Sequence, residues 1–175
     1  MTTSLRVRPE ASEYAPFYHG YVAAVPEGDV IELLRSGGRE LVEVIGRIPE
    51  DRGGFRYGPD KWSIREVIGH LIDAERIFSY RALRVARGDR TPLPGFEEKA
   101  YVQTAGSDAR TIADLTRELG AVRESTVLLF ESLPDEAWGR SGVASENEVS
   151  VRALAYIVAG HARHHLRILR ERYGV

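Results

Sequence analysis

The chain has 175 residues, of which 43% are hydrophobic and 29% charged, and a formal net charge of −2. This composition predicts a single domain over residues 1–175, and its mixed charges argue against a nucleic-acid partner, which needs a concentrated basic face. The sequence contains no run of the roughly 18–20 apolar residues that cross a membrane and no cysteine, so any metal ion would need imidazole or carboxylate ligands. Residues 1–9 lack the apolar stretch of a secretory signal, and we expect a cytoplasmic protein without a membrane partner.

The first 28 residues form no sustained hydrophobic period. They contain three prolines and four aromatic residues, Tyr14, Phe17, Tyr18 and Tyr21. Aromatic side chains this dense are seldom left in water, so we interpret the segment as an ordered lead-in that packs on the rest of the domain. The helical bundle itself is predicted over residues 29–174.

The first long helix is predicted to start after Asp29, a suitable N-cap, and to end at Pro49. Its apolar residues recur at helical spacing. Gly37 and Gly38 lie in its middle, where each costs about 1 kcal/mol relative to alanine. Two glycines at these positions predict either a break in the helix or a close packing contact.

The second long helix is predicted to begin with a capping box formed by Ser63 and Glu66, whose side chains bind each other's backbone N–H groups. Its apolar side continues to about Arg87. Residues 88–106 contain two prolines and several glycines. They predict a long crossover with a short helical piece at about 96–102.

The third long helix is predicted to start at Ser107 or Asp108 and to stop at Pro134. After a second long loop, Ser150 is the predicted N-cap of a fourth helix that ends at Gly174. No alternating strand pattern competes with these four periodic segments. The predicted fold is therefore all-α, a four-helix bundle with long crossover loops.

The five histidines form the most informative pattern. At about 100° per residue, His161 and His165 fall on the apolar stripe of the fourth helix, one helical turn apart. Two imidazoles at this spacing can bind one metal ion. His164 lies on the flank of the same stripe, and His70 lies at the border of the apolar side of the second helix, from which it could complete a triad. His19 lies in the lead-in and is predicted to be at the surface.

A hydrogen-bonded core histidine is the alternative at each of these positions. For two inward histidines this alternative requires a separate hydrogen-bond partner for each ring inside an apolar stripe. The pattern alone leaves both interpretations open.

If the chain is an enzyme, we expect a general base or a residue that orients a ligand. The candidates are Asp73, Glu75, Tyr101, Glu146 and Asn147. For each of them, a solvated surface position or an ion pair on a helix face is the more common role. The tryptophans, Trp62 and Trp138, are predicted to be structural anchors.

Two segments carry a resemblance to a known family. They are GPDKWSIREVIGHLIDAERIF (58–78) and AGHARHHLRILRERY (159–173). Both are similar to the DinB/YfiT-like superfamily of bacterial metal-binding four-helix proteins, and the similarity extends over essentially the whole chain from Tyr14 onward. The resemblance implies a bundle in which one histidine of the second helix and two of the fourth bind a divalent metal ion, namely His70, His161 and His165.

The resemblance also implies a class of activity, because the superfamily includes metal-dependent hydrolases and S-transferases that use a low-molecular-weight thiol. Three imidazoles leave a zinc ion with one open position for water or a thiol, and they also suit nickel, cobalt or iron. We therefore expect a zinc or nickel ion, a small-molecule substrate and a homodimer, and Gly69 and Gly160 would permit the close approach of another element. The alternatives are a non-catalytic stress-related or regulatory module with a stabilising or vestigial metal site, and a metal-free structural bundle.

Overall fold

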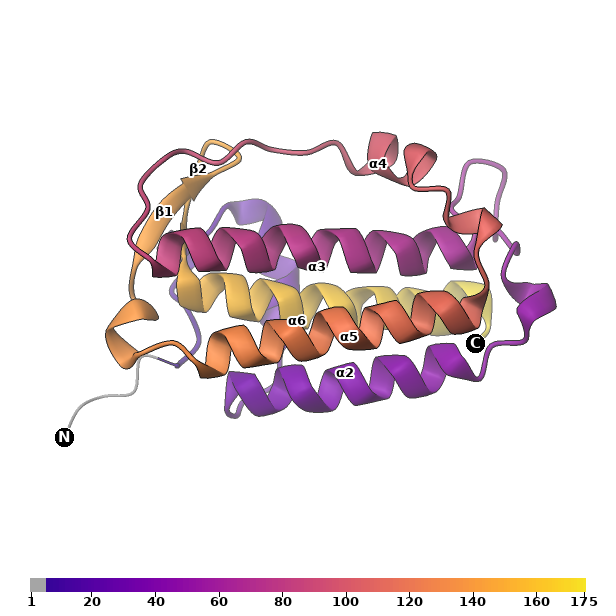
Figure 1. Cartoon of the computed structure of the whole chain (residues 1–175), viewed down its shortest axis with the longest axis horizontal. Coiled ribbons are helices and arrows are strands. Elements are labelled where there is room, and N and C mark those ends of the chain that lie inside the picture. The colour runs from indigo at the N-terminus through magenta and orange to yellow at the C-terminus, as the bar shows by residue number, and fades with distance from the viewer. Residues whose placement is uncertain (1–5) are drawn as a thin grey trace.

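The computed structural model describes residues 6–175, so the first five residues of the predicted lead-in lie outside it. Four long helices run along the longest axis of the molecule (Figure 1): α2 (Val30–Gly46), α3 (Ile64–Ala86), α5 (Ile112–Glu131) and α6 (Val151–Ile168). The helices α2 and α3 each pack against both α5 and α6. The predicted four-helix bundle is confirmed. None of the described helices is both long and apolar enough to cross a membrane.

Side-chain caps determine where the long helices begin. The carboxylate of Asp29 accepts hydrogen bonds from two backbone N–H groups at the start of α2, and Ser63 and Glu66 form the predicted capping box of α3. The hydroxyl of Ser150 caps α6. This helix continues through a π-helical turn and ends at Gly174, which adopts the left-handed conformation with a φ of 67°. These boundaries agree with the predictions.

The start predicted for the third long helix, Ser107 or Asp108, is wrong. The helix α5 begins four residues later, because the hydroxyl of Thr111 accepts the backbone N–H of Asp114 and forms the cap. Ser107 and Asp108 belong instead to a 3-10 turn. There, Asp108 accepts a hydrogen bond from the hydroxyl of Ser63, so the turn is fixed to the start of α3.

A small antiparallel hairpin, which the sequence did not predict, occupies the second long loop. It consists of β1 (Ser141–Ala144) and β2 (Asn147–Ser150), with Ser141 opposite Ser150. Its turn residues, Ser145 and Glu146, both have a positive φ, of 52° and 65°. Because such turns usually contain Asn-Gly or another glycine pair, the sequence carries no recognisable hairpin signal here.

Two short helices lie on the connections. The helix α4 (Glu98–Thr104) is the helical piece predicted in the crossover, and Leu93 of the same crossover pairs in parallel with β1. The helix α1 (His19–Ala24) lies in the lead-in, where no helix was predicted, and packs against α6. The lead-in is therefore ordered on the bundle, as expected.

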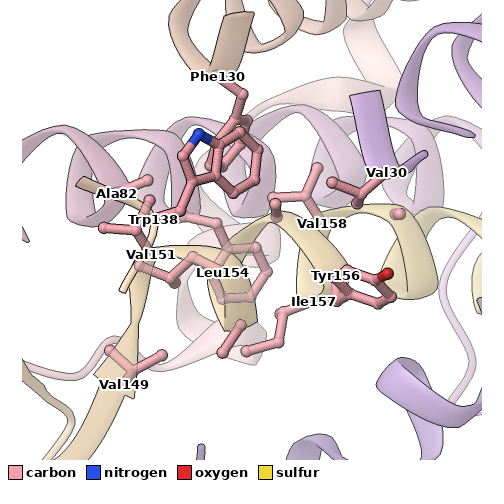
Figure 2. Close-up of a cluster of buried hydrophobic side chains, with 14 of the residues drawn as sticks. Val30, Ala82, Phe130, Trp138, Val149, Val151, Leu154, Tyr156, Ile157 and Val158 are labelled. Carbon is pink, nitrogen blue, oxygen red and sulfur yellow. The ribbon is translucent and has the colours of Figure 1, made fainter. Parts of the chain in front are cut away.

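The hydrophobic core has two parts, one at each end of the bundle. The part next to the hairpin surrounds Trp138, which is fully buried and lies 5.6 Å from Phe130 between ring centroids (Figure 2). The other part includes Ile45, Ile68 and Leu115. On each long helix the residues of the two parts follow one another along the sequence, so the boundary between them crosses the middle of the bundle.

Candidate metal centre

Three histidines meet in the middle of the bundle. His70 belongs to α3, and His161 and His165 lie one turn apart on the neighbouring α6. One nitrogen atom of each ring lies within 4.8 Å of the others, and within residues 6–175 this is the only such group of three or more histidine or acidic side chains. The three residues are between 4% and 8% exposed. The structure thus brings together the three positions that the resemblance implied.

The ring nitrogens of these histidines lack a full set of protein partners. The Nε2 atoms of His70 and His161 lie 3.0 Å apart, so without an ion one ring can donate a hydrogen bond to the other. The Nδ1 atom of His165 is buried and has no hydrogen-bond partner in the described part of the chain. Two nitrogens that bind one zinc ion at about 2.0–2.1 Å lie roughly 3–3.5 Å apart in tetrahedral geometry. The spacing of the facing pair therefore fits two ligands of one cation, and His165 offers a nitrogen within 4.8 Å of both.

Burial keeps the three imidazoles neutral. It lowers the pKa of His70 to about 4 and that of His165 to about 3. Burial, followed by the charges of the neighbouring histidines, lowers the pKa of His161 well below its ordinary value of 6.5. A neutral imidazole has a free lone pair on one nitrogen, which is the form that binds metal ions.

Two glycines next to the histidines let other segments of the same chain approach the helices. A Cβ atom on Gly160 would lie 2.0 Å from the backbone oxygen of Tyr21, and one on Gly69 would lie 2.1 Å from the hydroxyl of Ser107. The predicted close approach is therefore real, and it is made within the chain. At Gly160 it brings α1 onto α6 beside His161.

Aromatic rings surround the three histidines. Trp62 lies 4.8 Å from His70 between ring centroids, and Tyr21 and Phe78 lie 5.3 Å and 5.8 Å from His161. Such rings hold the imidazoles in place and limit the access of water. Tyr21 was not singled out from the sequence, although the aromatic density of the lead-in and the adjacent Gly160 were visible there.

The other two histidines lie where they were expected. His164 is half-buried at the flank, with its ring 5.1 Å from that of His165 and 5.2 Å from that of Tyr21. Burial lowers its pKa. His19 is exposed at the start of α1.

None of the acidic candidates for a general base joins the three histidines in one cluster within residues 6–175. Glu75 is buried, but both of its carboxylate oxygens accept hydrogen bonds from Arg123 of α5 at 2.7 Å. Burial raises the pKa of Asp73, and the charges that act on it come from α3, α5 and the turn before α5. The remaining candidates are exposed, on α4 or at the hairpin turn: Tyr101, Glu146 and Asn147.

A carboxylate that the sequence did not single out acts on Tyr21. Burial raises the pKa of Glu98, the first residue of α4. Burial and then the charge of Glu98 raise the pKa of Tyr21 to about 12, so this carboxylate acts on the tyrosine through its charge. Its position depends on how α4 folds over α3, and no local pattern in the sequence reports that.

The sequence profile of the DinB superfamily matches residues 33–169. The chain belongs to this superfamily. Among solved structures, YfiT from Bacillus subtilis is similar to this DinB protein with a TM-score of 0.71 and 16% identity, over 96% of this chain and 94% of YfiT. YfiT is described as a probable metal-dependent hydrolase with an unusual four-helix bundle topology. No curated protein matches the chain.

Two further solved structures share the fold of this DinB protein. A mycothiol-dependent maleylpyruvate isomerase has a TM-score of 0.66 and 11% identity, over 78% of this chain and 58% of the isomerase. A DinB-like protein of Bacillus subtilis, YjoA, has a TM-score of 0.59 and 21% identity, over 81% of this chain and 87% of its own. At these identities the similarity establishes the shared fold.

Proposed function

We propose that this protein is a metal-dependent enzyme that binds a divalent ion, zinc or nickel, through His70, His161 and His165. The observation that carries the proposal is the convergence of three buried, neutral imidazoles with the Nδ1 atom of His165 left without a partner. Burying these polar atoms in an apolar bundle is costly unless something binds them. A divalent ion would satisfy all three rings at once.

The residues around the three histidines suit a small-molecule reaction. A bound ion with three protein ligands would supply a Lewis acid with one open position for a water molecule or a thiol. Trp62, Tyr21 and Phe78 hold the rings and exclude bulk water from that position. Burial raises the pKa of Glu98, and its charge acts on Tyr21, so Glu98 is the carboxylate that we propose to test as a proton acceptor.

Two reaction classes remain as candidates, each supported by one structural neighbour. Hydrolysis is supported by YfiT, which is described as a probable metal-dependent hydrolase. A reaction that uses a low-molecular-weight thiol, for which we propose thiol transfer, is supported by the neighbour described as a mycothiol-dependent isomerase. The cytoplasmic location and the homodimer stay predictions, and light scattering on the purified protein tests the homodimer.

An anomalous scattering scan on crystals of untagged protein tests the metal site. We expect one peak about 2.0–2.1 Å from a nitrogen of each of the three rings, and its absorption edge would identify the element. A peak elsewhere, or none, would contradict the ligand assignment.

Assays of zinc- and nickel-loaded protein test the activity. The substrates would be a panel of esters and amides, and electrophiles offered together with a small thiol. Turnover by loaded protein that disappears in His161→Ala supports an enzyme. No turnover, in a protein whose thermal stability falls on chelation, would favour the non-catalytic module with a stabilising metal site.

A further inference from the structure

A basic cavity of about 410 Å³ lies on the surface of the bundle, between α1, α2 and the end of α6. Its volume falls in the range of small-molecule sites, roughly 300–1,000 Å³. The helix α1 contributes Gly20 and Ala24 to the wall, and a Cβ atom on Gly20 would meet nothing within 4 Å. These small residues leave the space open. The three histidines of the candidate metal centre do not line this cavity, so it is a separate site.

Three arginines form a stripe along one wall of the basic cavity. Arg163, Arg167 and Arg170 are separated by four and then three residues, so their side chains lie on one side of the helix. Like charges at this spacing repel each other. An anion bound among these arginines would relieve the repulsion.

The stripe has one charged partner in the part of the chain that the structure describes. Arg170 pairs with Glu40 of α2 at 2.9 Å. The Nε atom of Arg163 donates a hydrogen bond to the backbone oxygen of Ala24 at 3.2 Å, and Arg167 has no hydrogen bond or ion pair within residues 6–175. Two of the three guanidinium groups therefore line the cavity without a counterion.

One carboxylate in the wall opposes a bound anion. Glu171 lines the basic cavity and forms no ion pair within residues 6–175. Three arginines against two glutamates, Glu40 and Glu171, leave a formal surplus of one positive charge. Because this surplus is small and the arginines are exposed, an anion must also gain affinity from directed hydrogen bonds.

The rest of the wall offers one further polar group and an apolar surface. His164 is half-buried, and its imidazole can form a hydrogen bond with an oxyanion. Leu166 and Ala24 provide apolar contacts. The His164 ring lies 5.1 Å from that of His165, so the cavity adjoins the candidate metal centre. These groups suit an oxyanion that carries a small apolar substituent.

We infer that the basic cavity binds a phosphate group, either as the free ion or as the ester of a small organic molecule. A phosphate carries a charge of about −1.5 to −2 at neutral pH and has three strong acceptor oxygens, whereas a carboxylate has two oxygens. It can therefore accept hydrogen bonds from Arg163 and Arg167 at the same time, and each guanidinium can donate two. The inference does not depend on the proposed function, because no metal ligand lines the cavity.

Calorimetric titration of the purified protein with inorganic phosphate and with phenyl phosphate, at constant ionic strength, tests this inference. Arg167→Gln should weaken the binding of both probes at least about fivefold, and it removes no contact within the described protein. Arg172→Gln is the matched control, because Arg172 is an exposed arginine of the same turn that does not line the cavity. It should change the affinity less than about twofold.

Glu171→Gln gives a test of the opposite sign. Removing this carboxylate should strengthen the binding of both probes at least about twofold, because the surplus of positive charge rises by one. A variant that binds more tightly is also folded, so this result cannot come from a damaged protein. Unchanged or weaker binding in Glu171→Gln would contradict the placement of the phosphate beside it.

The metal centre is a competing place for a phosphate, and His161→Ala separates the two. We expect its phosphate affinity to equal that of wild type. Binding that is lost in His161→Ala but kept in Arg167→Gln would place the phosphate on the metal ion and overturn the inference.

The two probes identify the source of the phosphate group. Tighter binding of phenyl phosphate supports an ester, and equal binding supports the free ion. No saturable binding of either probe at millimolar concentrations, or the same loss in Arg167→Gln and Arg172→Gln, would overturn the inference and leave the metal centre untouched.

Discussion

The middle of the bundle contains two buried polar clusters, which differ in whether all of their polar atoms have partners. The first is the ion pair of Glu75 and Arg123, in which each carboxylate oxygen accepts one N–H and a third nitrogen of the arginine donates to the backbone oxygen of Leu34. The second consists of His70, His161 and His165, in which a buried ring nitrogen has no partner. Both clusters lie near the boundary between the two parts of the hydrophobic core.

This difference distinguishes a structural cluster from a candidate site. A buried charge is tolerated when its partner satisfies it completely, as Arg123 satisfies Glu75, and such a pair then has no capacity for a ligand. A cluster whose polar atoms converge but remain unsatisfied needs something from outside the chain. Each cluster contains one residue of α3: Glu75 faces α5 and His70 faces α6.

The largest expected effect is the loss of metal from the histidine cluster. His161→Ala removes one of the three proposed ligands, so metal affinity should fall by at least about 100-fold. Helical circular dichroism should stay nearly unchanged, because His161 is not a cap. His19→Ala, at an exposed histidine, is the matched control. Elemental analysis of both purified variants provides the measurement, and full metal content in His161→Ala would refute the assignment.

Breaking the ion pair should affect stability without affecting the metal. Arg123→Met leaves Glu75 buried and unpaired, and should lower the free energy of unfolding by about 3–5 kcal/mol. The double variant Arg123→Met with Glu75→Leu should recover most of this loss, because neither charge then remains. Urea denaturation measures both. The comparison of the two clusters fails if the single variant loses its metal, or if the double variant is no more stable than the single one.

Metal removal should destabilise the protein by a comparable but smaller amount. At a free metal concentration of 100 to 1,000 times Kd, the bound ion contributes about 3–4 kcal/mol, so chelation should lower Tm by roughly 6–15 °C. A thermal melt with and without chelator measures this shift. His161→Ala should show no such shift, whereas Arg123→Met should show the same shift as wild type from a lower starting Tm.

The sequence predicted those parts of the fold that depend on local contacts. Asp29, Ser63 and Ser150 cap their own helices, so their roles could be inferred from the neighbouring residues alone. The start of α5 could not, because Ser107 and Thr111 are both suitable caps, and the choice depends on how the preceding turn packs against α3. The hairpin depends in part on pairing with Leu93, about fifty residues earlier in the chain.

The candidate site was predictable to a similar extent. The helical period placed His161 and His165 on one inward face, while His70 was added with support from the family resemblance. Glu75 stayed one of several open candidates, since nothing local shows that Arg123 of another helix binds it. Tyr21 and Glu98 were missed because their proximity follows from how α1 and α4 pack on the bundle.

Gly38 gives a smaller and local test of the ion pair. A Cβ atom there would lie 2.4 Å from Cγ of Arg123, whereas one on Gly37 would have its nearest contact, with the same side chain, at 4.0 Å. Gly38→Ala should therefore displace Arg123 and cost about 1–3 kcal/mol. Gly37→Ala should be neutral or stabilising by up to about 1 kcal/mol. Chemical denaturation of the two variants compares them directly, and equal effects would show that the close packing at Gly38 does not hold the arginine in place.

The smallest loss of stability is expected for a more exposed glutamate–arginine ion pair. Glu13 of the lead-in accepts hydrogen bonds from Arg152 and Ser150 at the start of α6. These bonds and the charge of Arg152 outweigh burial and hold the pKa of Glu13 below its ordinary value of 4.5. The stabilisation is therefore present above about pH 4.5 and is lost as the pH falls through the lower folded-state pKa.

The variant Glu13→Gln should accordingly be less stable than wild type by about 0.5–1 kcal/mol at neutral pH, and the difference should shrink as the pH falls below about 4.5. A series of urea midpoints from neutral to acidic pH measures this. A difference that persists in acid would mean that the amide disturbs packing and that the ion pair contributes little. By contrast, the buried pair of Glu75 and Arg123 should cost several times more to break, because partial solvation at Glu13 lets water replace much of what the arginine provides.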